Sequence, residues 1–134
     1  MTIRTFLSLW VAFAALACAE QTEAPPTGQL LYVRHCASCH GLGGVGDGPV
    51  AESLMKSPAD LTMLAAGNEG RFDEARIMQV IDGRREVVEH GSREMPVWGA
   101  VFETELEGER YGTYAAMLHV RALTDYLRSL QADR

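Results

Sequence analysis

The heptapeptide HCASCHG at residues 35–41 constrains this chain more than any other feature. It places Cys36 and Cys39 with two residues between them and puts His40 directly after the second cysteine. Two thiols at this spacing serve as a redox pair, as half of a structural zinc site, or as the attachment point of a haem. They also close as a small disulfide in exported proteins. The rest of the sequence must decide among these possible roles.

The zinc and thiol readings find little support elsewhere in the chain. A structural zinc site needs four ligands, usually from two paired motifs, and no second cysteine pair is present. His90 and His119 are too far apart in the sequence to form the usual histidine pair, so a zinc site would need scattered ligands. A thioredoxin-like pair expects alternating strands and helices around it, and no strand pattern is visible. These alternatives stay open but explain few residues.

Haem attachment uses all three residues of the motif. Two cysteines at this spacing form thioethers to the vinyl groups of a haem, and the histidine that follows supplies an axial nitrogen to the iron. We therefore predict one covalent haem c, tethered by Cys36 and Cys39 and ligated by His40.

A single histidine leaves the sixth coordination position of the iron to be filled. Thioether sulfur is a suitable soft ligand, and His/Met ligation raises the haem potential into a range useful to electron carriers. Met95 is the preferred ligand because it lies in an irregular stretch and precedes Pro96, which restricts the backbone. His90 is the rival ligand. The other methionines beyond the motif are Met55, Met63, Met78 and Met117.

The N-terminus has the layout of a secretory signal peptide. Arg4 precedes an apolar run that ends at Ala17 and is too short to span a bilayer comfortably. Either residues 1–19 are removed, or residues 1–17 are removed and Cys18 is lipidated, which would anchor the chain to the membrane. Residues 20–27 then form a linker and residues 28–134 the folded domain, in the periplasm. Export agrees with a c-type haem, which is attached outside the bacterial cytoplasm.

The charge balance bears on the partners. The formal net charge is −6, and there is no basic patch or interleaving of aromatic and basic residues. Nucleic acid is therefore excluded as a partner. An acidic surface favours redox partner proteins with basic docking faces.

Apolar spacing predicts an all-α fold with long loops. We expect helices over 28–38, 72–83 and 113–130, and a short helix or turn after the Ser57–Asp60 stretch. Residues 41–49 hold five glycines and predict a loop. Residues 84–100 are expected to be irregular, and residues 101–114 to form a surface excursion or a solvated loop.

Residues 28–130 resemble the class I c-type cytochromes. The attachment motif matches, as do Gly28 and Tyr32 before it and Leu123 and Tyr126 in the last predicted helix. The resemblance implies a cytochrome c fold, with three to five helices wrapped around one covalently attached haem. It also implies that the first and last helices cross closely, which only a glycine at the contact permits.

The resemblance also assigns roles around the haem. The carbonyl of Pro49 would accept a hydrogen bond from His40 Nδ1, Met95-Pro96 would be the distal ligand loop, and Trp98 is a candidate for a propionate contact. Arg84, Arg85 and Arg93 are further candidates for the propionates.

The implied function is that of an exported monohaem one-electron carrier between redox proteins, not an enzyme. Two alternatives remain. One is a dedicated cytochrome subunit of a dehydrogenase or oxidase complex. The other is a haem enzyme or gas sensor with a labile sixth ligand.

Overall fold

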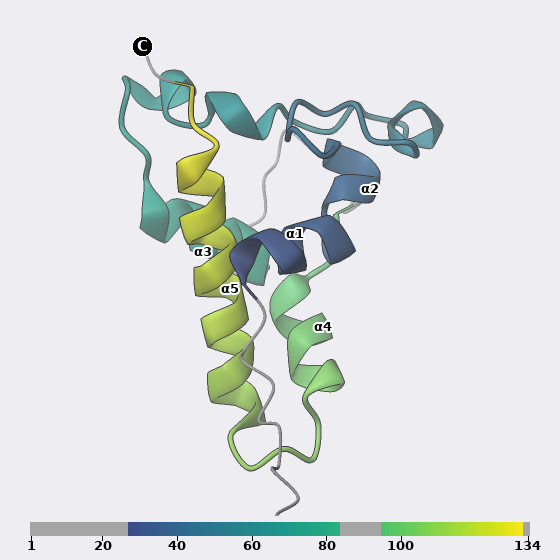
Figure 1. Ribbon diagram of the computed structural model, residues 1–134, viewed down its shortest axis with the longest axis vertical. Coiled ribbons are helices and arrows are strands. Elements are labelled where there is room, and N and C mark those ends of the chain that lie inside the picture. Colours follow the sequence, from purple (N-terminus) through teal and green to yellow (C-terminus); the bar gives the residue numbers. More distant parts are fainter. Residues whose placement is uncertain (1–26, 84–94, 133–134) are drawn as a thin grey trace, which may run out of the picture.

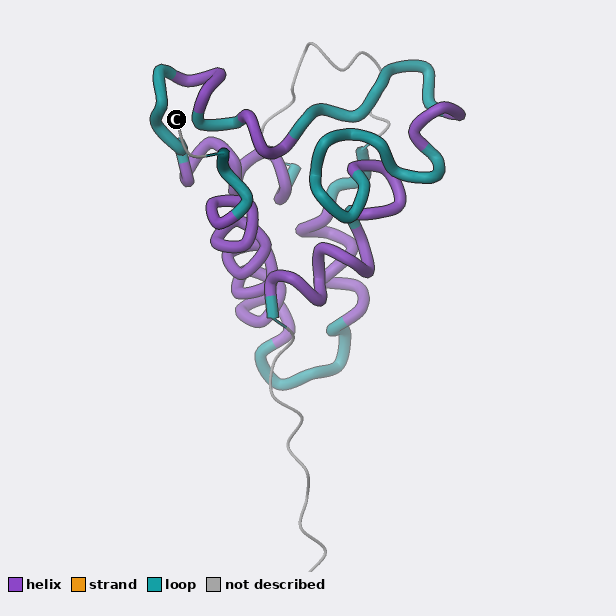
Figure 2. The backbone as a smooth tube through the Cα atoms, turned by 45° about the horizontal axis from the view of Figure 1, so that its top comes forward, coloured by secondary structure: helices purple, strands orange, loops and turns teal. Residues whose placement is uncertain are grey.

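The computed structural model describes residues 27–83 and 95–132 of the chain. Over these residues it contains five α-helices and no strand, which confirms the all-α prediction (Figure 1). The helices are α1 (Gly28–His35), α2 (Ala37–His40), α3 (Glu74–Asp82), α4 (Trp98–Glu105) and α5 (Gly112–Ser129). The long connection from α2 to α3 is mostly loop, with short 3₁₀ helices at Ala51–Ser53, Leu61–Met63 and Ala66–Asn68 (Figure 2).

Helix α5 is the element against which α1, α3 and α4 pack. Its buried residues recur every three or four positions and include Val120, Leu123 and Leu127. This spacing gives a helix one apolar face, and it confirms the helix predicted over 113–130. Met117, one turn before Val120, is 47 % exposed, so the buried face does not extend to it.

Helices α1 and α5 cross at Gly28. A β-carbon at this position would collide with the carbonyl oxygen of Ala122 and would lie 2.9 Å from the β-carbon of Tyr126. The ring of Tyr32, one turn further along α1, lies 5.2 Å from the ring of Tyr126 between centroids. The crossing predicted from Gly28, Tyr32 and Tyr126 is therefore present, and the glycine is what allows it.

The phenol of Tyr32 joins α1 to the loop that follows the cysteine motif. Its hydroxyl donates a hydrogen bond to the carbonyl oxygen of Gly41 at 2.6 Å. The side chain is fully buried, and this burial is the main reason that the pKa of Tyr32 rises to about 12. The hydroxyl thus stays a donor at any physiological pH.

Helix α3 confirms the helix predicted over 72–83. The carboxylate of Asp73 accepts a hydrogen bond from the backbone N–H of Arg76 at 3.0 Å and so caps the first turn. Gly83 ends the helix with a φ of 84°, a left-handed conformation that favours glycine.

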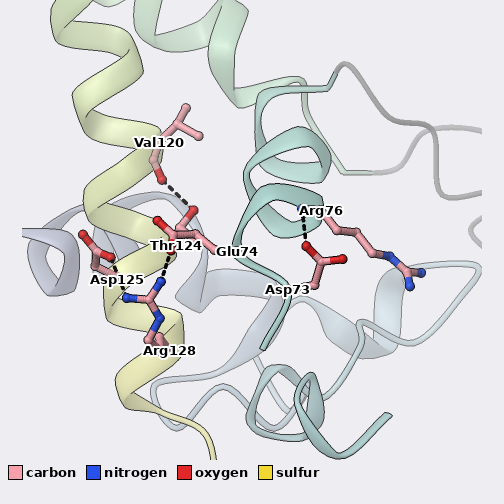
Figure 3. Close-up of polar contacts among 7 residues, drawn as sticks. All are labelled: Asp73, Glu74, Arg76, Val120, Thr124, Asp125 and Arg128. Carbon is pink, nitrogen blue, oxygen red and sulfur yellow. Dashed lines mark hydrogen bonds and ion pairs between the residues drawn. The ribbon is translucent and has the colours of Figure 1, made fainter. Parts of the chain in front are cut away.

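Polar contacts tie α3 to the end of α5 (Figure 3). The guanidinium of Arg128 pairs with the carboxylate of Glu74 on α3 and lies 3.3 Å from that of Asp125 on its own helix. It also lies over the ring of Phe72, 5.5 Å from the centroid. The buried hydroxyl of Thr124 donates a hydrogen bond to the carbonyl of Val120 at 2.9 Å, so its donor is not left unpaired in the core.

Helix α4 was not expected. Residues 101–114 were predicted to be a surface excursion or a solvated loop and residues 84–100 to be irregular, but a helix covers Trp98–Glu105 and a turn leads into α5 at Gly112. Phe102 is completely buried and anchors α4 to the core. The large apolar residues of α4, Trp98, Val101 and Phe102, all lie in its first part, so the acidic stretch 103–109 that follows shows no apolar spacing from which the helix could be predicted.

Several predictions concern residues outside the described ranges. They include the signal peptide at 1–19, the fate of Cys18, most of the linker at 20–27, and residues 84–94 of the irregular stretch. Over the described part of the chain, no helix has the length and apolarity needed to cross a bilayer.

Candidate haem site

A cavity of about 360 Å³ lies among α1, α2, α3, α5 and the loop from Leu54 to Asn68. This volume is in the range of small-molecule and cofactor sites. The predicted site residues Cys36, Cys39, His40, Met95 and Trp98 all line it, whereas Pro49 does not. Residues as far apart in the sequence as Cys36 and Trp98 thus line one cavity.

Helix α2 is a single turn that presents the cysteine motif. Cys36 precedes the turn and Cys39 lies within it, three residues later, so both thiols face the same side. The backbone N–H groups of Cys39 and His40 both donate to the carbonyl of Cys36, at 3.1 and 2.9 Å. The two cysteines are free thiols, and both reach the cavity. Burial raises the pKa of the Cys36 thiol to about 12.

The glycine-rich loop closes the end of α2. Gly46, Gly48 and Val50 donate backbone hydrogen bonds to the carbonyls of His40, Cys39 and Ser38, at 2.9, 3.0 and 3.1 Å. These bonds satisfy carbonyls that the helix end would otherwise leave unpaired. A β-carbon at Gly48 would collide with the carbonyl oxygen of Ser38, so the loop can approach only with glycine there.

The imidazole of His40 is oriented by Ala59, not by Pro49. Nδ1 of His40 lies 3.0 Å from the carbonyl oxygen of Ala59, so the assignment to Pro49 was wrong. The loop doubles back along α2, which leaves Pro49 exposed, and the stretch that begins at Pro58 passes the ring. An Nδ1–H that donates to a carbonyl fixes the tautomer with the lone pair on Nε2, the form that ligates metals.

Two methionines reach the cavity, Met95 and Met63. Met55 is 89 % exposed, and neither it nor Met78 or Met117 lines the cavity. His90, the rival ligand, lies outside the described residues. The structure therefore leaves Met63 as the competitor to Met95 within the part of the chain that it describes.

The cavity wall is mostly apolar, with polar residues at a few points. Helix α3 contributes Ile77, Val80 and Ile81 to it. The polar residues are Lys56, Ser57, Asn68, Asp73 and Arg76. None of these was predicted from the sequence to lie at the site. The position of Arg76 could have suggested it, because a spacing of four places it on the same helix face as Val80. Arg84, Arg85 and Arg93, which were singled out, lie outside the described residues.

Trp98 connects the cavity to a cluster of rings. Its ring and that of Phe102 each lie 5.2 Å from the ring of His35, between centroids, in edge-to-face arrangements. The ring of His119 lies 5.3 Å from that of Phe102, also edge to face. Among the residues that the structure describes, His35 Nε2 and His119 Nδ1 are buried and have no hydrogen-bond partner, and His35 Nε2 is 4.0 Å from the carboxylate of Glu105.

Burial lowers the pKa of His35 and of His119, and it outweighs the opposing attraction of Glu105. In the unfolded chain each imidazole has an ordinary pKa near 6.5 and binds a proton as the pH falls towards that value. In the folded protein both imidazoles stay neutral at the same pH. Their contribution to stability is complete above that pKa and is lost as the pH falls below it.

We expect the free energy of unfolding to fall between pH 7 and pH 5, and to fall less in His35→Phe and in His119→Phe. Phenylalanine keeps an aromatic ring in the cluster but cannot be protonated. Urea titrations of the haem-loaded protein at several pH values measure this slope. A slope unchanged in both variants would show that other groups control the acid sensitivity.

The residues around the cavity suit a covalently attached haem. Two free thiols lie beside an imidazole whose Nδ1 is hydrogen-bonded, the walls are mostly apolar, and Lys56 and Arg76 offer cations to carboxylates. Over the described residues, no group of three or more His, Cys, Asp or Glu side chains could hold a bare metal ion, so a zinc site finds no support there.

The sequence matches the model of a known protein family. The model of the family described as "Cytochrome C oxidase, cbb3-type, subunit III" matches residues 23–108, well over half of the chain. Comparisons with curated proteins and with solved structures gave no match. The matched stretch contains the cysteine motif, the glycine-rich loop, α3, Met95 and α4. The chain therefore belongs to the cbb3-type cytochrome c oxidase subunit III family and is a class I c-type cytochrome, a haem-binding electron-transfer protein.

Proposed function

We propose that this chain is an exported monohaem cytochrome c that carries single electrons between redox proteins. Cys36 and Cys39 would form the thioethers, and His40 and Met95 would be the axial ligands of the iron. The main support for the proposal is that these four residues line one mainly apolar cavity.

The chain's own residues would hold the group and shield it. A bound haem iron supplies the exchange of one electron between its ferric and ferrous states. The carbonyl of Ala59 keeps the His40 ring oriented, so the ligand need not move when the charge changes. Apolar side chains such as Leu61 and Ile81 exclude water, and Lys56 and Arg76 are placed to pair with propionates.

A second candidate function is that of a dedicated cytochrome subunit of an oxidase or dehydrogenase complex. The family match favours it, because the family is described as an oxidase subunit. Co-purification of the chain in stoichiometric amount with such a complex would favour the subunit, and isolation on its own would favour the free carrier.

A haem enzyme or gas sensor needs a sixth position that is open or loosely held. Met95 and Met63 at the cavity both supply a sulfur that could fill it. Ready binding of carbon monoxide to the native protein would contradict the carrier proposal.

The proposed cellular location follows from the N-terminal sequence. We propose the periplasm, reached by the signal peptide at 1–19, or by 1–17 with a lipidated Cys18 that holds the domain at the membrane. Mass spectrometry of the mature protein distinguishes a chain that starts at Glu20 from one with an acylated Cys18.

The attachment chemistry is tested by removing the thiols. We expect the mature protein to retain the mass of one haem under denaturing conditions, and the double variant Cys36→Ala, Cys39→Ala to retain none. Each single variant should keep one thioether. The matched control is Cys18→Ser, which should retain the haem. A pyridine haemochrome assay reports the number of thioethers independently, and a wild-type chain without covalent haem would refute the proposal.

A further inference from the structure

Gln131, just after the end of α5, bonds to the loop between α2 and α3. Its Nε2 donates to the carbonyl of Leu61 at 2.8 Å and to the carbonyl of Leu127 at 2.7 Å. Its Oε1 accepts a hydrogen bond from the backbone N–H of Ala65 at 2.8 Å. Leu61 and Ala65 precede Gln131 by 70 and 66 positions, so one side chain joins two distant parts of the chain.

The surroundings fix which way the carboxamide of Gln131 faces. Its amino group meets two carbonyl oxygens, which only accept, and its oxygen meets an N–H, which only donates. If the amide were turned over, its oxygen would face two carbonyl oxygens and its amino group would face a donor. The side chain is partly buried, so polar groups left unpaired there would cost free energy. The position therefore uses the two donors and the acceptor of glutamine together.

The loop segment that Gln131 bonds to forms one wall of the haem cavity. Leu61 and Leu64 line the cavity, whereas Gln131 does not. The backbone N–H of Ala132 adds a further link, to the carbonyl of Thr62 at 3.2 Å. Figure 1 shows the C-terminal end of α5 beside this loop. Gln131 therefore acts on the cavity through the residues that it holds, not by contact with what the cavity contains.

The first residue of this wall segment has an anchor of its own. The backbone N–H of Leu61 donates to the carbonyl of Gly44 at 2.7 Å. Two residues earlier, the carbonyl of Ala59 bonds to the ring of His40. Neither bond involves Gln131. Loss of the Gln131 side chain should therefore release the residues after Leu61 and leave the orientation of the His40 ring unchanged.

We propose that Gln131 is a positioning residue that holds residues 61–65 in place as a wall of the cavity, which keeps water from a bound haem and so raises its reduction potential. The inference rests on the proposed function, because it gives Gln131 a role toward that haem. Apolar side chains exclude water only while they stay packed. Water near the iron stabilises the ferric state, which carries the additional positive charge, and solvent access is one of the determinants of a haem potential.

Two variants at Gln131 test the role of its hydrogen bonds. Gln131→Leu removes all three bonds of the side chain. Gln131→Glu keeps an oxygen for the N–H of Ala65 but places an acceptor against two carbonyl oxygens. The matched control is Ser129→Ala. It removes a side-chain bond at the same helix end, from the Ser129 hydroxyl to the carbonyl of Tyr126 at 2.6 Å, and this bond does not reach the loop.

Amide hydrogen exchange of the reduced, haem-loaded protein, followed by NMR, measures how firmly the wall is held. We expect exchange at Ala65 to become at least about tenfold faster in both Gln131 variants. The increase in Gln131→Glu is the decisive one, because an oxygen that can accept from Ala65 is retained there. Exchange at Leu61, which is bonded to Gly44, should change by less than about threefold. Ser129→Ala should leave both amides as in the wild type.

A potentiometric titration measures the effect on the haem. We expect both Gln131 variants to have a lower reduction potential than the wild type, and Ser129→Ala to match the wild type. The near-infrared charge-transfer band of the oxidised protein should persist in all of them, because the axial ligands are not changed. A Gln131 variant that loses this band would show that the residue supports a ligand and not the wall, which overturns the proposal.

The other outcomes are equally decisive. Exchange at Ala65 that is unchanged in Gln131→Glu overturns the proposal, and so does a potential that stays the same or rises. If circular dichroism shows that Gln131→Leu does not fold, Gln131→Glu decides alone. A failure of the proposed function would show in the wild type, as the absence of covalent haem, whereas a failure of this inference shows only in the variants.

Discussion

Met95→Ala is expected to abolish the near-infrared charge-transfer band of the oxidised protein and to lower its reduction potential by on the order of 0.1 V. The band reports a sulfur bound to ferric iron, and replacing a thioether by water or a stronger donor stabilises the ferric state. Spectra of the oxidised protein and a potentiometric titration measure the two effects. The reduced variant should also bind carbon monoxide, because no methionine sulfur then holds the sixth position.

Met63→Ala is the matched control, since Met63 is the other methionine at the cavity. It should keep the band and shift the potential only slightly through altered packing. If Met63→Ala loses the band and Met95→Ala keeps it, the ligand has been assigned to the wrong methionine. If both keep it, the sulfur comes from elsewhere, and if neither variant nor the wild type shows it, His/Met ligation is refuted.

Gly28→Ala is expected to destabilise the protein by about 3 kcal/mol, the upper range for overpacking a tight contact. At an exposed helix position the same change stabilises by up to about 1 kcal/mol, because alanine is the better helix former. The expected sign is reversed here because the added carbon would collide with the carbonyl of Ala122. Guanidinium unfolding of the haem-loaded protein, followed by circular dichroism, measures the loss.

Gly43→Ala provides the comparison for Gly28. No atom lies within 4 Å of the place its β-carbon would take, and its φ is not in the left-handed region. We expect this variant to match the wild type or to gain a few tenths of a kcal/mol. Equal stabilities of the two alanine variants would show that α1 can shift away from α5 at little cost.

The sequence predicted those parts of the site that depend on local spacing. The cysteine motif is a single helical turn, and its three residues needed no distant contact to be recognised. The helices around Val80 and Leu123 show apolar residues at helical spacing, and Asp73 and Gly83 mark the ends of α3. Gly28 was placed correctly because the close crossing of two helices excludes every larger residue there.

The remaining features depend on contacts that no local pattern encodes. Whether Pro49 or Ala59 offers its carbonyl to His40 is decided by how the loop folds back on α2, which involves several glycines with φ near 80°. Helix α4 is held by the buried ring of Phe102 and by Trp98, which packs against the core, and its last residues are acidic. The cations Lys56 and Arg76 reach the cavity only once α3 and the loop before it are in place.

The bond between His40 and Ala59 joins residues nineteen positions apart and so closes a loop. Closing a flexible loop of this length restricts many backbone conformations, and its entropic cost grows only slowly with length. The closed segment carries Leu54, Lys56 and Pro58, part of the cavity wall. Anything that immobilises His40 therefore also orders this wall. Occupation of the cavity and folding of the loop around it should then behave as one cooperative event, with ligand affinity and local stability inseparable.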